Sequence, residues 1–222
     1  MVPSTTSVGH DSQERLLRKA AAIIARGGVI AFRTDTFYGL GVDPFNRSAV
    51  QRIKQLKGRK ENQPILIVIS DRDQVECFIA DRSQTFDLLA ETFWPGALTL
   101  IGKAASEVPE EITAGTQTVG VRLPADDIVR DLVRACGGAL TAPSANPSGE
   151  KPARVAQDIE RYFGSAVDLI IDGGAAQSDR PSTVVDGSGA EPKLIREGAI
   201  AWAEICDLIA QEKSQLIRNR AR

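Results

Sequence analysis

The sequence predicts an α/β fold, a single domain in which helices flank a mixed parallel and antiparallel open sheet. Short apolar runs that suit buried strands alternate along all 222 residues with segments whose apolar side chains recur at helical spacing. The composition is ordinary for a globular domain, with 42% hydrophobic and 25% charged residues. It does not shift sharply along the chain, and no run of glycine and proline resembles a linker, so one domain is expected.

The first predicted element is a helix, because Asp11 and Glu14 have the spacing of a capping box and Gly27 ends the apolar periodicity. The residues before Asp11 lack the basic and apolar segments of a secretory signal. Three segments are therefore expected: a flexible tail at 1–10, a domain at 11–200, and a C-terminal helix with a basic tail at 201–222.

The other elements follow from periodicity and from continuous apolar runs. Helical spacing indicates helices over 48–57, 73–79, 83–93, 126–135, 153–163 and 202–217. Apolar runs indicate strands over 29–32, 65–69, 97–101, 118–122, 139–142, 167–171, 182–186 and 193–196. Residues 104–117 are expected to form an irregular loop.

Composition argues against several classes of function. The single histidine is His10, in the predicted tail, so a histidine base, a Ser–His pair and a histidine-rich metal site are not expected. A net charge of −2 counts against a general nucleic-acid binder. The three cysteines are widely spaced in apolar helical patterns, which predicts buried, reduced thiols in a reducing compartment such as the cytoplasm. No apolar run approaches the ~20 residues of a membrane span.

Polar side chains follow two of the predicted strands. Thr34, Asp35, Thr36 and Tyr38 come after the first strand, and residues 141–146 (TAPSAN) follow another. Ligands of open α/β sheets bind at the carboxyl ends of strands. We therefore expect one binding site built from both clusters.

The charged residues near these clusters have either a structural role or a role in binding a ligand. Lys57 and Arg59 close a helix, where the dipole stabilises them, or they clamp a phosphate. Arg122 shares a strand face with Thr118 and Gly120, and its burial requires an anion, which is either a structural carboxylate or a substrate carboxylate. Asp35 is a candidate ligand for a Mg²⁺ ion brought by a nucleotide, and so is Asp172, although solvated loop carboxylates are commoner.

Eight sequence blocks occur in order between Gly27 and Gly198: FRTDTFYGLG, KGRKENQPILI, FWPGALTLI, TVGVRLP, TAPSANPSG, DGG, RPSTVVD and LIREG. Together they resemble the YrdC-like family of threonylcarbamoyl-AMP synthases in its short, single-domain form. The paired KxR and SxN signatures of that family stand here as Lys57/Arg59 and Ser144/Asn146. The resemblance implies a twisted sheet with a large concave, positive groove.

The resemblance also implies an activity: L-threonine, bicarbonate and ATP give threonylcarbamoyl-AMP and pyrophosphate, the first step of threonylcarbamoyl-adenosine formation at tRNA position 37. It implies Mg²⁺ with ATP, downstream tRNA threonylcarbamoyl-transferase proteins as partners, and weak tRNA binding. Lys57 and Arg59 would stabilise charge during catalysis. The implied threonine-binding residues are Thr36, Arg122, Ala142 and Ser182. The implied ATP-binding residues are Lys57, Arg59, Gln63, Thr118, Ser144, Asn146 and Arg196.

Four positions depart from patterns in the family, and they concern minor contacts: Arg33, Gln63, Val68 and Ala153. A non-catalytic RNA-binding module of the same fold is the alternative function, against which the net negative charge counts.

Overall fold

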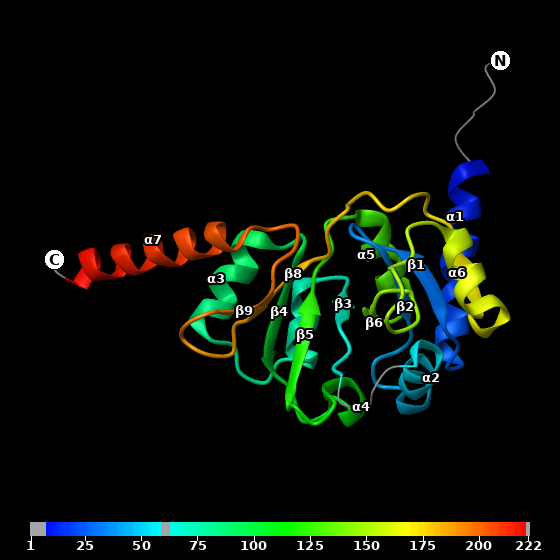
Figure 1. Cartoon of the computed structure of the whole chain (residues 1–222), viewed down its shortest axis with the longest axis horizontal. Helices are drawn as coiled ribbons and strands as arrows, with labels where there is room; N and C mark the ends of the chain where they lie inside the picture. The colour runs from blue at the N-terminus through cyan, green and yellow to red at the C-terminus, as the bar shows by residue number, and fades with distance from the viewer. Residues whose placement is uncertain (1–7, 59–62, 221–222) are drawn as a thin grey trace, which may run out of the picture.

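The computed structural model describes residues 8–58 and 63–220. Its strands form two sheets that lie next to each other (Figure 1). The three-stranded sheet has the order β2 (Tyr38–Gly41), β1 (Ile30–Arg33), β7 (Leu169–Ile171). The six-stranded sheet has the order β6 (Ala139–Thr141), β3 (Ile67–Ile69), β5 (Thr118–Arg122), β4 (Leu98–Lys103), β8 (Thr183–Asp186), β9 (Lys193–Arg196). Parallel and antiparallel pairs occur in both sheets, which confirms the predicted mixed α/β class.

The two sheets meet where β2 runs beside β6. Thr141 donates its backbone N–H to Val42 O at 3.0 Å and its hydroxyl to Leu40 O at 2.9 Å. Leu40 N donates to Pro143 O at 3.0 Å, and Gly39 forms an isolated bridge with Ser144. The sequence predicted one sheet, and the structure has two that are joined by these hydrogen bonds.

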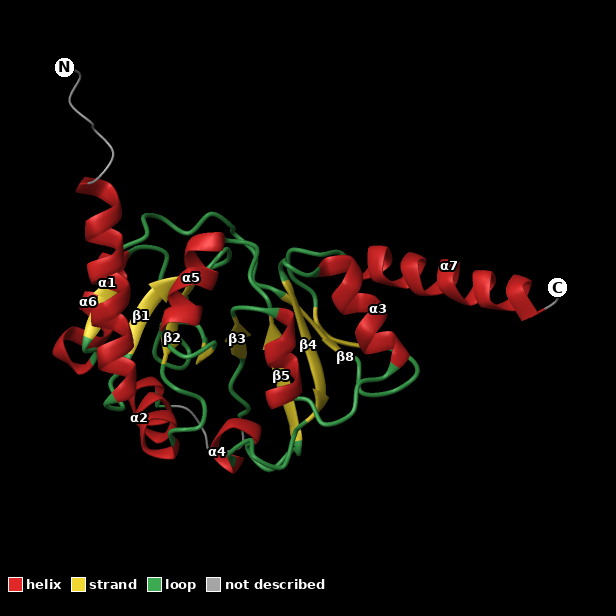
Figure 2. Ribbon diagram, turned by 180° about the vertical axis from the view of Figure 1, so that it is seen from behind, coloured by secondary structure: helices red, strands yellow, loops and turns green. Residues whose placement is uncertain are grey.

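Helices cover the sheets. They are α1 (Val8–Ala25), α2 (Arg47–Lys57), α3 (Gln84–Phe93), α4 (Glu110–Thr113), α5 (Asp127–Ala135), α6 (Ala156–Phe163) and α7 (Trp202–Arg220), with 3₁₀ turns η1 (Arg72–Cys77) and η2 (Gly164–Ala166). Helices α1 and α5 pack against each other, and both are in front of the strands in the rear view (Figure 2). Their apolar faces meet β1, where Ile23, Leu132 and Phe32 belong to one buried cluster. Helix α7 projects from the body (Figure 1).

Capping residues explain where α2 begins and ends. Asn46 accepts a hydrogen bond from Ala49 N at 3.1 Å, which satisfies a free donor of the first turn. Gly58 ends the helix in the left-handed region with φ 57°, a conformation that glycine adopts without strain. The cap thus holds Lys57 in the last turn of the helix, close to the polar segment after β6.

Three expected boundaries are wrong. Helix α1 begins at Val8, so Asp11 lies inside it, while residues 1–7 of the predicted tail lie outside the described residues. Tyr38 belongs to strand β2 and not to a loop, because its backbone pairs with Arg33. The loop at 104–117 contains the single turn α4.

The cysteine prediction is also wrong in part. Cys77 and Cys206 are exposed free thiols, and only Cys136 is partly buried. Burial raises the pKa of the Cys136 thiol to about 11. Within the described residues, no helix is both long and apolar enough to cross a bilayer.

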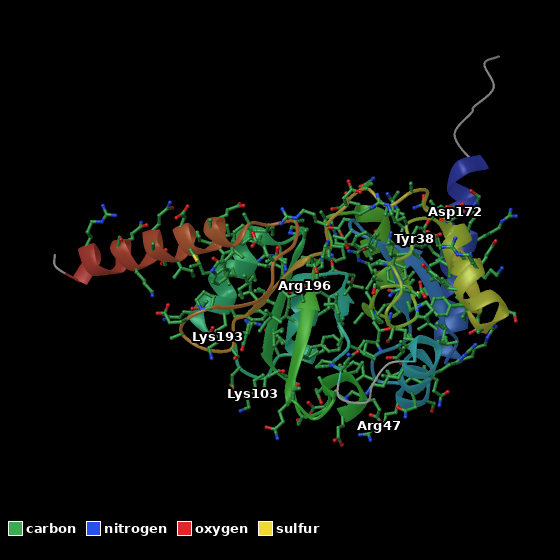
Figure 3. The ribbon with its side chains drawn as sticks, viewed as in Figure 1. Tyr38, Arg47, Lys103, Asp172, Lys193 and Arg196 are labelled. Carbon is green, nitrogen blue, oxygen red and sulfur yellow. The ribbon has the colours of Figure 1, made fainter. Side chains whose placement is uncertain are left out.

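Tyr38 joins β2 to the segment after β7, next to Asp172 (Figure 3). Its buried hydroxyl donates to Gly174 O at 2.8 Å and accepts from Gly173 N at 3.1 Å. Burial raises the pKa of this phenol, which therefore stays neutral and able to donate. The hydroxyl thus fixes the start of the long segment that leads to β8.

Replacing Tyr38 with phenylalanine is expected to lower the free energy of unfolding by about 1–3 kcal/mol, because two backbone groups lose their partner. Urea unfolding measures the effect. Tyr162→Phe is the matched control, since its exposed hydroxyl donates to Lys151 O at 3.1 Å, and a change below about 0.5 kcal/mol is expected. Equal stability of the Tyr38→Phe variant and the unsubstituted protein would contradict this role of the hydroxyl.

Candidate active site

A cavity of ≈ 650 Å³ opens between the β1–β2 turn, the segment after β6, and the strands β4, β5, β8 and β9. Alternate residues of β4, β5 and β8 face the cavity, Ile101, Gly120 and Val184 among them, and polar groups converge on it from several elements. Seven of the expected site residues line it: Thr36, Thr118, Arg122, Ala142, Ser144, Ser182 and Arg196. The structure therefore brings together the two polar clusters that the sequence placed at strand ends.

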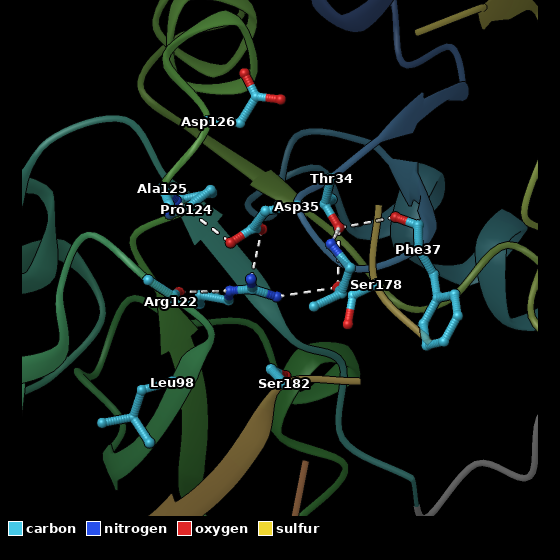
Figure 4. Close-up of polar contacts among 12 residues, drawn as sticks. Thr34, Asp35, Phe37, Leu98, Arg122, Pro124, Ala125, Asp126, Ser178 and Ser182 are labelled. Carbon is cyan, nitrogen blue, oxygen red and sulfur yellow. Dashed lines mark hydrogen bonds and ion pairs between the residues drawn. The ribbon is translucent and has the colours of Figure 1, made fainter. Parts of the chain in front are cut away.

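Arg122 is the most buried charged group of the cavity, with 2% of its surface exposed. Its Nε donates to Gly96 O at 2.9 Å and its Nη1 to Thr36 Oγ1 at 3.2 Å (Figure 4). Its Nη2 forms an ion pair with Asp35. Burial lowers the pKa of Arg122, and the Asp35 carboxylate opposes that change. The anion that the sequence required for this arginine is thus a carboxylate of the protein itself.

Arg196 extends from β9 over the same cavity and lies near the middle of the molecule (Figure 3). Its Nη2 donates to Ser182 O at 2.9 Å and lies 3.3 Å from Ser182 Oγ, which is 2.9 Å from Thr99 Oγ1. Burial and the neighbouring Arg122 both lower the pKa of Arg196. No ion pair of Arg196 occurs within residues 8–58 and 63–220, so its charge remains available to an anionic ligand.

The turn between β1 and β2 presents two buried hydroxyls. Thr34 Oγ1 donates to Phe37 O at 2.8 Å and lies 3.1 Å from Thr36 Oγ1. Thr36 N donates to Thr34 Oγ1 at 3.2 Å, which closes the turn. Both threonines line the cavity. The threonine repeat in TDT therefore serves to build the turn as well as to face a ligand.

Lys57, which the resemblance implied as an ATP-binding residue, contacts the segment after β6. Its Nζ donates to Asn146 O at 2.7 Å and to Ser144 O, and Ser148 N donates to Lys57 O at 2.7 Å. Lys57 is 5% exposed and Asn146 is 7% exposed. The cavity lining within the described residues includes Ser144 but neither of these two. The lysine amine thus holds the backbone that presents Ser144.

The remaining expected residues are placed as follows. Arg59 lies outside the described residues, and Gln63 is exposed, while its neighbour Pro64 lines the cavity. Val68 lines the cavity as well, whereas Ala153 is fully buried elsewhere. Arg33 pairs with Asp126 at 2.8 Å.

The candidate carboxylates for Mg²⁺ have other partners. Asp35 pairs with Arg122, and Asp172 accepts from Gly174 N at 2.9 Å and lies 3.3 Å from the Tyr38 hydroxyl. The described residues that line the cavity include no aspartate or glutamate. Protein carboxylates in this part of the chain therefore do not fit a Mg²⁺ site in the cavity.

The sequence analysis did not identify Thr99 as part of the site, and it did not identify Asp35 as the carboxylate that pairs with Arg122. Thr99 carried a usable signal, because it sits between Leu98 and Leu100 and therefore faces away from the core with Ile101. Both Thr99 and Ile101 line the cavity. The pairing of Asp35 carried no local signal.

Comparisons with known proteins find relatives of similar sequence and fold. A family model described as "Telomere recombination" (Sua5_yciO_yrdC) matches residues 22–198. A threonylcarbamoyl-AMP synthase of Halorhodospira halophila is 37% identical over 175 residues, 78% of this chain and 92% of the relative. A threonylcarbamoyl-AMP synthase of Pyrococcus abyssi is 37% identical over 199 residues, 90% of this chain, which spans only 58% of that relative's length.

The fold has a solved counterpart. The crystal structure of P. abyssi Sua5 complexed with L-threonine superposes with a TM-score of 0.85 at 37% sequence identity, covering 88% of this chain and 58% of that one. The resemblance that the eight sequence blocks predicted is thus confirmed by sequence and by structure. Because the family model spans most of the chain and relatives more than a third identical match along their length, the chain belongs to the Sua5/YciO/YrdC family.

Proposed function

We propose that the protein is a threonylcarbamoyl-AMP synthase, which condenses L-threonine, bicarbonate and ATP to threonylcarbamoyl-AMP and pyrophosphate. The observation that carries the proposal is the cavity in which Arg122 and Arg196 converge with the hydroxyls of Thr36 and Ser182. Two cations suit a carboxylate and a polyphosphate, and the hydroxyls suit the polar side chain of an amino acid. The relatives that carry this name support the reaction.

We propose for the site residues the roles that the family resemblance implies. Arg122, Thr36, Ser182 and the backbone of Ala142 would bind threonine, with Arg122 on its carboxylate. ATP would be held by Arg196, Thr118 and Ser144 at the cavity, supported by Lys57, Arg59, Gln63 and Asn146.

In the reaction, the neutral amine of threonine attacks the carbon of CO₂ and releases a proton to solvent, or attacks bicarbonate with loss of water, and in either case forms a carbamate. A carbamate oxygen then attacks the α-phosphorus of ATP, and the bond to pyrophosphate breaks. No histidine is required, because the protein contributes proximity and positive charge rather than a general base. Mg²⁺ would arrive with the phosphates of ATP. The product would then be passed in the cytoplasm to tRNA-modifying partners.

The test is pyrophosphate release from ATP, with threonine and bicarbonate each omitted in turn. Release that requires both, with a product of the mass of threonylcarbamoyl-AMP, is expected. Release that requires neither would contradict the proposal and indicate simple ATP hydrolysis. No release, combined with salt-sensitive RNA binding, would instead favour the RNA-binding module.

A further inference from the structure

Asp35 lies in the turn between Thr34 and Thr36, yet it is separated from the cavity by Arg122. The described residues that line the cavity include Arg122 and Ser182 but not Asp35. In the view of Figure 4, Asp35 and Ser182 are on opposite sides of the Arg122 guanidinium. Asp35 therefore contacts this arginine from the side away from the cavity.

The Asp35 carboxylate is itself held in place. Its Oδ1 pairs with Arg122 Nη2, and its Oδ2 accepts from Ala125 N at 3.4 Å. The next residue, Asp126, caps α5 by accepting from Ile128 N at 2.9 Å. Asp35 thus ties the β1–β2 turn directly to the segment before α5 and, separately, to Arg122 on β5.

The guanidinium of Arg122 has five N–H groups. Nε uses its N–H on Gly96 O, Nη1 uses one on Thr36 Oγ1, and Nη2 faces Asp35. Within the described residues, neither Arg122 Nη2 nor Asp35 Oδ1 has a hydrogen bond of ordinary geometry, so their contact is an ion pair. Because Nη2 is buried against Asp35, the second N–H of Nη1 is the group that remains for a ligand oxygen.

We propose that Asp35 is a positioning residue: it holds Nη2 and so orients the guanidinium of Arg122 such that the remaining N–H of Nη1 receives the carboxylate of the amino-acid substrate. An arginine buried to this degree is costly without an opposite charge. Asp35 supplies that charge and leaves the cavity-facing edge of the guanidinium open. The inference rests on the proposed function, since it deepens the role given there to Arg122.

The test is Asp35→Asn, which keeps the size of the side chain and an acceptor for Ala125 N. The KM for threonine is expected to rise at least about tenfold, while kcat at saturating threonine and the KM for ATP stay within about twofold, because only binding is weakened. Asp126→Asn is the matched control, since it removes the neighbouring ion pair with Arg33 and retains a good helix cap. That variant should keep the KM for threonine. A threonine KM unchanged in Asp35→Asn would overturn the proposal.

A second measurement does not depend on activity. Thermal unfolding is compared for Asp35→Asn made in the unsubstituted chain and in an Arg122→Met chain. If Asp35 acts on Arg122, the first comparison shows a lower Tm and the second shows little or none. Equal shifts in both backgrounds would overturn the proposal. If the unsubstituted protein does not use threonine, the proposed function fails. The comparison of Tm values in the two backgrounds then decides by itself whether Asp35 holds Arg122.

Discussion

Replacing Arg122 with methionine is expected to lower kcat/KM for threonine by about 100-fold or more. Truncation of one partner in a buried, hydrogen-bonded charge pair costs about 2–5 kcal/mol of binding. The same change leaves Asp35 buried without its counter-charge, so the free energy of unfolding should fall by about 3–5 kcal/mol. Steady-state kinetics and urea unfolding measure the two effects separately.

The double variant Arg122→Met/Asp35→Asn separates binding from folding. Both charges are then absent, so much of the lost stability should return while threonine use does not. Arg82→Met serves as the control, because its ion pair with Asp87 is solvent-exposed and neither residue lines the cavity. Threonine turnover that recovered together with stability in the double variant would show that Arg122 acts only on folding.

Replacing Lys57 with methionine is expected to lower the free energy of unfolding by about 2–3 kcal/mol and to raise the KM for ATP about tenfold. The carbonyls of Ser144 and Asn146 lose a charged donor. Because Ser144 lines the cavity, a looser segment there should weaken nucleotide binding. Unfolding in urea and ATP-dependent kinetics are the measurements.

Lys103→Met is the control for that variant. Its amine lies 3.6 Å from Asp81 with both side chains mostly exposed, so a change in stability below about 0.5 kcal/mol is expected. If Lys57→Met matched this control in both stability and ATP dependence, the proposed support of the SxN segment would be rejected.

The pattern of apolar residues was sufficient to predict most elements. The residues of β5 alternate as in a strand, and the apolar residues of the flanking helices recur at helical spacing. Strand β2 was missed for a physical reason. Its sequence YGLG contains two glycines, and all four residues are buried, so neither alternation nor an apolar run marks it. The exposure of Cys77 was missed because η1 has three residues per turn, which shifts each side chain from its place in an α-helical pattern.

The sequence predicted most of the residues that line the cavity, but not the contacts that these residues make with one another. Strand alternation placed Arg122 on a face with Thr118 and Gly120 and required an anion near it. That this anion is Asp35 depends on how the β1–β2 turn approaches β5, which no local spacing encodes. Likewise, the resemblance named Lys57 and Asn146 as ATP-binding residues, but the contact of the Lys57 amine with the backbone carbonyl of Asn146 depends on the direction of the main chain.

The cavity draws on segments spread along almost the whole chain, from Thr34 in the first turn to Arg196 in the last strand. Strand β8, which delivers Ser182, enters the sheet as the parallel neighbour of β4. A nascent chain that has emerged from the ribosome only up to β7 therefore contains the β1–β2 turn but not yet Ser182 or Arg196. A ligand that needs the complete cavity stabilises only a chain in which β9 is already in place. Ligand binding therefore cannot assist the earlier stages of folding.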